Sequence, residues 1–353
     1  MSKLINFPTA TKEEMMAINE VVFANVITDG NLSLFCDVRT GVESGDRLAW
    51  VNPLSMVGKP SRGCEPEDDT PSAVLVEKEW DLKSYDFRIA QCYTDLEQIL
   101  YRLGLKEAAE RGDLSGTDYA AFMDTLVTNA MDSMYKRFVW FGDTEAANVA
   151  DGGKILNGVD VDFYTVVDGI FKQIDTMIAA GDEGVVVTAI GANTKATYAL
   201  QMSEVWDPIA VLTSVILDAD VAIEAEEDQE LLVSRFFMNK LKAKMLSLPQ
   251  YTESQFTRNE QGMMTVTFLG YTVVEMKEWD HQIKNYIQDG TKYYKPFRAL
   301  FTTKSNLKVG VPSTETFYQL LSWYEKKDRK YYTDAADKID VIVMRGELVS
   351  IAH

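Results

Sequence analysis

The sequence has few histidines and cysteines. His281 and His353 are the two histidines, and Cys36, Cys64 and Cys92 are scattered without a CxxC pair. Zinc sites need clustered Cys and His, and a serine or cysteine nucleophile usually needs a histidine base. We therefore expect no metal site, and we expect His281 to lie on a polar surface turn or helix. Odd, scattered cysteines favour reduced thiols in a reducing compartment.

Long apolar runs and phosphate-binding loops are also missing from the sequence. No apolar run approaches the ~20 residues of a membrane helix, and the start lacks the apolar block of a secretion signal. We therefore expect a soluble protein that is made and used in a cytoplasm. No GxGxxG follows a predicted strand, and the calcium-loop resemblance at Asp218 fails at Ile223 and Gln229. The sequence therefore predicts no cofactor.

Basic residues are outnumbered, with 35 Lys and Arg against 54 Asp and Glu, so the net charge is -19. Such a surface repels phosphate backbones and does not favour anionic membranes. This argues against a free DNA-binding protein but allows a container that encloses DNA. The basic, aromatic segment 323–332 could contact nucleic acid, form a loop with paired charges, or make an oligomer contact. We favour paired charges, because Glu325 and Asp328 interrupt the run.

The 353 residues, 46% of them hydrophobic, suffice for one large or two medium domains. Apolar residues with helical spacing predict a helix over Asp118–Phe138, roughly 30 Å long at 1.5 Å per residue. Further helices are predicted near residues 11–22, 94–103, 161–180 and 313–324. Thr94 begins a capping box, Asp207-Pro208 marks the start of another helix, and one more helix ends near Leu246.

Strands are predicted before and after these helices. The alternation of Leu34, Cys36 and Val38 predicts a first strand. The other predicted strands are 48–51, 74–80, 85–93, 185–190, 263–269, 271–276, 298–302, 339–344 and 348–351, with a surface loop over 58–71. Strands and helices are segregated along the chain, which favours an α+β fold over a doubly wound α/β fold.

The order of three stretches resembles the major capsid proteins of tailed double-stranded-DNA bacteriophages, and most of all those of Bacteroides-type phages and prophages. These proteins have the Hong Kong Ninety-seven-type capsid fold. The first stretch runs from Thr40-Gly41-Val42 through Gly63-Cys64-Glu65-Pro66 to Lys78-Glu79-Trp80 and Arg88-Ile89-Ala90-Gln91-Cys92. The second is Phe138-Val139-Trp140-Phe141-Gly142-Asp143, followed by Asp151-Gly152-Gly153 and Asp168-Gly169. The third is Phe297-Arg298-Ala299-Leu300, followed by Asn306-Leu307-Lys308-Val309-Gly310 and Trp323-Tyr324. The resemblance would place an aromatic residue at the end, where this chain has Ala352-His353.

The resemblance implies a division of the chain into four parts. Residues 1–35 would be an N-terminal arm that crosses onto a neighbour, and 36–92 an extended β-hairpin loop with flanking strands. Residues 93–200 would form a peripheral domain with a long spine helix. Residues 201–353 would be mainly an axial domain, with C-terminal strands returning to the peripheral domain.

The resemblance also implies a structural function in which the chain catalyses no reaction. The chain would assemble with itself, as hexamers and pentamers, into an icosahedral shell in the bacterial host cytoplasm. It would become the capsid of the virion and enclose DNA without sequence-specific binding. Scaffolding, portal and decoration proteins would be its further partners, and no membrane would be involved. Candidate interface residues are Arg62, Trp80, Arg88, Trp140, Asp143, Trp323 and Tyr324.

Three alternatives remain open at the level of sequence. An encapsulin-like compartment would have the same fold and hold an enzyme cargo. A tail or connector protein would form tubes or rings. A hydrolase with paired carboxylates would show a deep cleft with two acids of shifted pKa, although no pair among the 54 acids stands out. For the tryptophans at 80, 140 and 206, the ordinary alternative to a binding role is a place in the core.

Overall fold

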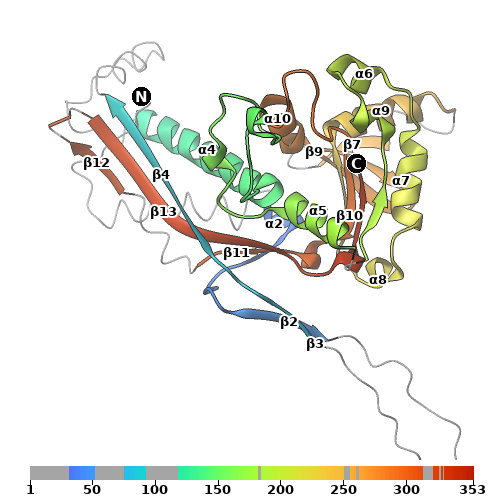
Figure 1. The fold of residues 1–353 in the computed structure, drawn as a ribbon, viewed down its shortest axis with the longest axis horizontal. Helices are drawn as coiled ribbons and strands as arrows, with labels where there is room; N and C mark the ends of the chain where they lie inside the picture. The colour runs from blue at the N-terminus through green and yellow to red at the C-terminus, as the bar shows by residue number, and fades with distance from the viewer. Residues whose placement is uncertain are drawn as a thin grey trace, which may run out of the picture.

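The computed structural model describes residues 32–51, 75–92, 118–181, 184–249, 255–259, 262–312, 321–325, 327–328 and 330–353. These residues form a mixed α+β fold in which helices pack on a seven-stranded sheet and a long ribbon extends away from it (Figure 1). The predicted helices near 11–22 and 94–103, the predicted loop over 58–71 and Arg62 lie outside the described residues.

The seven-stranded sheet has the order β5-β14-β10-β6-β9-β8-β7. β14 pairs with β5 and β6 pairs with β9 in parallel, and the other neighbours are antiparallel. The strands are β5 Val186–Thr188, β6 Gln229–Ser234, β7 Phe256–Arg258, β8 Met264–Phe268, β9 Tyr271–Met276, β10 Ala299–Thr303 and β14 Val349–Ala352.

Both faces of this sheet are buried. Leu231 and Val233 face one core with α7 (Pro208–Leu217) and α9 (Arg235–Leu246). Leu232, between them in the strand, faces a second core with α4, α5 (Ile170–Ala180) and α10 (Lys277–Asn285). Successive side chains of a strand point to opposite faces, so apolar runs without alternation fit this position.

The long ribbon lies beside α4 (Asp118–Phe141) (Figure 1). β13 (Lys330–Val343) pairs with β4 (Lys83–Cys92) along most of its length, and it also pairs with β11 (Leu307–Gly310) and β12 (Leu321–Glu325). The ring of Tyr85 on β4 packs against Tyr135 and Phe138 of α4, with centroids 5.9 and 5.5 Å apart. The core therefore continues from the sheet along the helix.

A second, two-stranded ribbon projects from the body of the molecule. β2 (Arg47–Val51) pairs antiparallel with β3 (Leu75–Glu79), and both point away from the seven-stranded sheet (Figure 1). We call β2 and β3 the projecting ribbon. The remaining elements are α2 Leu32–Phe35, β1 Asp37–Arg39, α6 Tyr198–Ser203, α8 Val221–Glu224 and short 3-10 turns at Val149–Asp151, Val161–Phe163, Gly191–Thr194, Lys304–Asn306 and Gly346–Leu348.

Several predicted elements are confirmed and others are wrong. The helix predicted from Asp118 is present and runs on to Phe141, and Asp207 caps α7 by accepting from the Ile209 amide at 3.0 Å. The predicted strand at Leu34 is wrong there, because Leu32 and Phe35 lie one helical turn apart and both are buried in α2. The predicted helix near 313–324 is wrong from residue 321 onward, where the chain forms β12.

Candidate assembly surfaces

Trp80 lies at the root of the projecting ribbon and is only 2% exposed. It packs with Val42, Ile342 and Met344 in a small separate core. A Cβ added to Gly310 would lie 2.6 Å from the Trp80 ring, so glycine at 310 makes room for the indole. The side chain of Trp80 therefore lies inside the subunit, where it fixes the direction of the ribbon.

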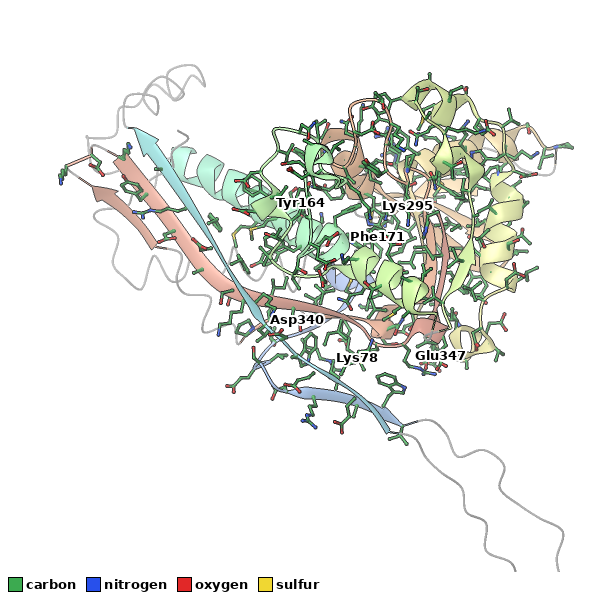
Figure 2. The ribbon with its side chains drawn as sticks, in the orientation of Figure 1. Lys78, Tyr164, Phe171, Lys295, Asp340 and Glu347 are labelled. Carbon is green, nitrogen blue, oxygen red and sulfur yellow. The ribbon has the colours of Figure 1, made fainter. Side chains whose placement is uncertain are left out.

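Two polar contacts tie the same root to β13. Lys78 of β3 donates from Nζ to the Val343 carbonyl at 2.7 Å, and the Asp81 amide donates to Asp340 Oδ2 at 2.8 Å. Figure 2 shows Lys78 and Asp340 near the root of the ribbon. Asp340 is 8% exposed, and burial raises its pKa to about 6. The ribbon is thus attached by side chains as well as by the chain itself.

The projecting ribbon has one packed side and one exposed side, because Leu48 and Trp50 of β2 are half-buried against the small core around Trp80. Val51 is 59% exposed, and Arg47 pairs with Glu77 at 3.0 Å across the surface. An isolated two-stranded ribbon is marginally stable in water at best. The outer side of the ribbon, which includes Val51, is therefore exposed in the described part of the chain.

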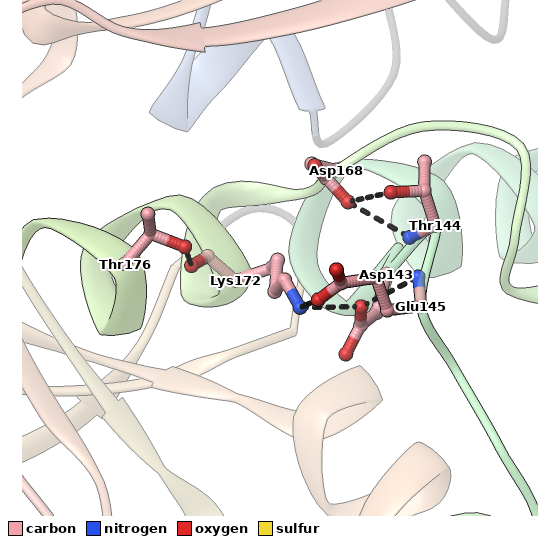
Figure 3. Close-up of polar contacts among 6 residues, drawn as sticks. All are labelled: Asp143, Thr144, Glu145, Asp168, Lys172 and Thr176. Carbon is pink, nitrogen blue, oxygen red and sulfur yellow. Dashed lines mark hydrogen bonds and ion pairs between the residues drawn. The ribbon is translucent and has the colours of Figure 1, made fainter. Parts of the chain in front are cut away.

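A polar network closes the loop that follows α4 (Figure 3). Lys172 of α5 pairs with Asp143 at 2.9 Å and with Glu145 at 2.7 Å. Burial alone would lower the pKa of Lys172, but the hydrogen bonds and charges of Glu145 and Asp143 raise it above its usual range. Asp168 accepts from both the amide and the hydroxyl of Thr144 at 2.8 Å. Asp143, a predicted interface residue, is thus already paired within the subunit.

Gly142 and Gly169 let this loop lie directly against the end of α4. A Cβ on Gly142 would lie 2.2 Å from the Val167 carbonyl oxygen, and one on Gly169 would lie 2.7 Å from the Phe138 oxygen. No side chain fits at these distances. The loop is therefore held close by its backbone, and the helix predicted over 161–180 begins only after Gly169, at Ile170.

Three predicted interface residues lie in the β4–β13–β12 ribbon. The guanidinium of Arg88 lies over the Tyr332 ring, 4.7 Å from its centroid, in a cation–π contact. The backbone register pairs Trp323 with Tyr332 and Tyr324 with Tyr331. The basic, aromatic segment is therefore a β-hairpin rather than the helix end or loop that we favoured.

Trp140 is a core residue. It is 1% exposed, and its ring centroid lies 4.9 Å from Trp279 and 5.7 Å from Phe171. The side chain is enclosed by α4, α5 and α10, as expected for the ordinary role of a tryptophan. We do not retain Trp140 as a surface contact.

Apolar side chains are exposed around the seven-stranded sheet. Val205, Val221, Leu217 and Leu269 are 93%, 75%, 68% and 55% exposed. They lie next to α6, in α8, at the end of α7 and in the β8–β9 turn. Single exposed apolar residues such as these are ordinary on a protein surface.

No sequence pattern predicted that Arg298 is buried, yet its side chain is only 7% exposed. Its guanidinium lies 4.2 Å from the centroid of the Phe171 ring, and its Nε donates to the Lys295 carbonyl at 2.9 Å. Burial lowers the pKa of Arg298 to about 10. A charged residue in a predicted strand suggests a solvated position, and only the tertiary packing of α5 on β10 shows otherwise.

His281, Cys36 and Asp280 occupy separate places in the fold. His281 is exposed on α10, where its Nδ1 lies 3.1 Å from Asn285 Nδ2. Burial raises the pKa of the Cys36 thiol far above its usual range. Burial also raises the pKa of Asp280 to about 8, and Asp280 accepts from the Phe236 amide at 3.1 Å, at the start of α9.

Within the described ranges, no three His, Cys, Asp or Glu side chains group as a metal site would require. In the same ranges no helix is both long and apolar enough to cross a membrane.

Comparison with solved structures shows the fold. A chain of the satellite phage P4 procapsid including size determination (Sid) protein matches with a TM-score of 0.52 and 9% identity, over 95% of this chain and 98% of that chain. A chain of Gordonia phage Cozz matches with 0.49 and 6%, over 91% and 85%. A chain of the capsid of the native GTA particle matches with 0.46 and 10%, over 100% and 93%. No protein-family model matches the sequence, and no curated protein matches it.

Proposed function

We propose that this chain is the major capsid protein of a tailed double-stranded-DNA bacteriophage, a structural subunit that assembles into an icosahedral shell around the phage genome. The observation that carries the proposal is the fold match to a P4 procapsid chain, which spans nearly the whole of both chains. Similar fold alone does not fix function. The projecting ribbon adds a physical reason, because its outer side is exposed and offers a surface to a neighbouring subunit.

In this proposal the parts of the chain have the roles of a Hong Kong Ninety-seven-type subunit. The projecting ribbon, with residues 52–74 between its strands, is the extended loop that lies over an adjacent subunit. β1 and β4 flank it, and β1 pairs with β11 whereas β4 pairs with β13. Helix α4 is the spine of the peripheral domain, and the seven-stranded sheet is the axial domain around the five- and six-fold axes. Residues 1–35 form the arm.

The contacts in such a shell are heterologous, so that one surface of a subunit meets a different surface of the next. Many modest interfaces per subunit give collective stability. The net charge of -19 fits a container that holds DNA without binding it tightly. Scaffolding, portal and decoration proteins are further proposed partners during assembly in the host cytoplasm.

Sedimentation velocity of the purified chain tests this proposal. We expect one population of very large, uniform particles, or discrete pentamers and hexamers, in exchange with free subunits. A capsid subunit should shift toward the large species as the protein concentration rises. A single monomer peak at every concentration would contradict the proposal.

A further inference from the structure

The outward side of α10 is cationic. Lys277, His281 and Lys284 are exposed there, and their spacing of four and three positions places them on one side of the helix. Neither lysine forms an ion pair within the described part of the chain. The two acids of α10 lie elsewhere on the helix, because Asp280 is buried and Glu278 is half-buried where α10 meets α4. This side of α10 therefore has the opposite sign to the chain as a whole, whose net charge is -19.

An exposed aromatic residue lies beside this helix. Phe163 is 55% exposed, and the guanidinium of Arg137 lies over its ring, 5.4 Å from the centroid. Arg137 donates from Nε to the Phe163 carbonyl at 2.9 Å and forms no ion pair with a described residue. Burial lowers the pKa of Arg137 and Tyr286 opposes this shift, so Tyr286 lies near the guanidinium; its ring is 6.0 Å from that of His281. These residues and the exposed side of α10 form one surface, which we call the α10 face.

A surface of the opposite character lies where α7 ends and α8 begins. Leu217 and Val221 are 68% and 75% exposed there. The acids interleaved with them are exposed and form no ion pair within the described ranges; they are Asp218, Asp220 and Glu224. We call residues 217–224 the acidic turn. Exposed apolar residues with charges around them have the composition of a small interface, with an apolar centre and a polar rim.

The α10 face and the acidic turn lie on opposite sides of the seven-stranded sheet. Trp279 and Ile283 of α10 pack in the core on one face of the sheet, and Val215 of α7 and Ile223 of α8 pack in the core on the other. Figure 1 shows α10 above the sheet and α8 below it. One chain therefore cannot join these two surfaces to each other, whereas two copies can. Such a contact is heterologous and repeats from copy to copy.

We propose that the α10 face binds the acidic turn of a second copy of this chain. Phe163 would meet the apolar residues of the turn, and the cations of the face would meet its carboxylates, which fixes the orientation of the two copies. Asp160 and Asp162 precede Phe163, so we expect the acidic turn to lie toward α10. The contact deepens the proposed shell function and rests on it, because it names one of the contacts between subunits.

Charge reversal on the two surfaces tests the pairing. Lys284→Glu and Glu224→Lys should each raise the protein concentration needed for assembly about tenfold, because like charges would then face each other. The double variant has the net charge of the wild type and should assemble at a concentration at least threefold lower than either single variant, since residues in contact are not additive. Light scattering against protein concentration measures the threshold.

Two comparisons make this result specific to the contact. Lys338→Glu makes the same change at an exposed lysine of β13 and should leave the threshold within about twofold, as usual for a charge outside an interface. Circular dichroism should show the same spectrum for every variant. Additive losses in the double variant, or a normal threshold in both single variants, would overturn the proposal.

Carbodiimide cross-linking of assembled wild-type particles gives an independent measurement, since it joins an amine to a carboxylate in direct contact. The particles are assembled from mixed ¹⁵N-labelled and unlabelled chains. We expect peptides that join Lys277 or Lys284 of one chain to the acidic turn of another. Particles without these links would overturn the contact alone, whereas a wild type that forms no particles would contradict the shell function and this contact with it.

Discussion

Trp80 is the residue that couples the projecting ribbon to the body of the subunit. Its amide donates to the Asp46 carbonyl at 2.9 Å, its carbonyl accepts from the Gly45 amide at 2.9 Å, and its ring covers Gly310. A residue in this position has two effects, since it stabilises the fold and also determines where the ribbon points. The two effects are separable by experiment.

Gly310→Ala should destabilise the subunit by about 1–3 kcal/mol, as expected when a well-packed core is overfilled. The added methyl group would lie 2.6 Å from the indole of Trp80 and force it to move. Urea unfolding followed by circular dichroism measures the change. Gly191→Ala is the matched control, because a Cβ there meets no atom within 4 Å. An equal loss of stability in both variants would show that Trp80 does not fill this space tightly.

Asp280 should make the subunit less stable as the pH rises from about 4 to 8. Burial raises its folded-state pKa to about 8, whereas an unfolded aspartate titrates near ~3.9. The folded state therefore binds more protons in this window, and the free energy of unfolding falls with increasing pH. Asp280→Asn does not titrate, so its stability relative to the wild type should rise across the window, by at most about 1.4 kcal/mol per pKa unit.

Urea unfolding of both proteins at several pH values measures this difference. Asp289→Asn is the control. Burial would raise the pKa of Asp289, but hydrogen bonds from Thr291 and Lys292 lower it below its usual value. The Asp289 variant should therefore show no trend relative to wild type between pH 5 and 8. The same flat profile for Asp280→Asn would mean that Asp280 is ionised in the folded state.

At the scale of elements, β13 connects most of the structure. Its 14 residues pair with β4, β11 and β12, so that segments far apart in the sequence share one ribbon. The sequence predicted only its apolar part, near residues 339–344. The segment from Lys330 to Lys338 includes four charged residues and has the composition of a loop. Only its pairing with β4 explains why that part is extended.

Local signals predicted the helices better than they predicted this ribbon. The apolar spacing in α4 and the Asp207-Pro208 cap act within one or two turns, so they can be read from a short window. The pairing of Trp323 with Tyr332 is a tertiary contact, and aromatic residues at helical spacing near 313–324 suggested a helix instead. Interface residues were harder to predict than either, because Trp80 and Trp140 are buried by segments far away in the sequence.

Charge reversal in the ribbon regions should weaken assembly more than folding. Arg88→Glu would lose the cation–π contact with Tyr332 on an exposed surface, and Arg62→Glu would change the segment between β2 and β3. We expect at least a tenfold rise in the protein concentration needed for assembly, with an unchanged circular dichroism spectrum. Light scattering against concentration measures it. Lys338→Glu, on the strand β13 that pairs with β4, is a control for charge alone. A normal assembly threshold in both arginine variants would refute their assignment.

At the scale of the whole molecule, the subunit is extended rather than compact. The seven-stranded sheet lies at one end, the β4–β13–β12 ribbon reaches the other, and the projecting ribbon leaves the body between them (Figure 1). Such a shape exposes several separate surfaces. In the proposed shell, the subunit would be stabilised by several neighbours at once.

Electron microscopy of the particles formed by the purified full-length chain tests this central proposal most directly. The account predicts closed icosahedral shells of pentamers and hexamers, in which the projecting ribbon of each subunit lies over its neighbour. Tubes or isolated rings would favour a tail or connector protein. Particles without closed symmetry, or only single subunits at high protein concentration, would contradict the proposed function.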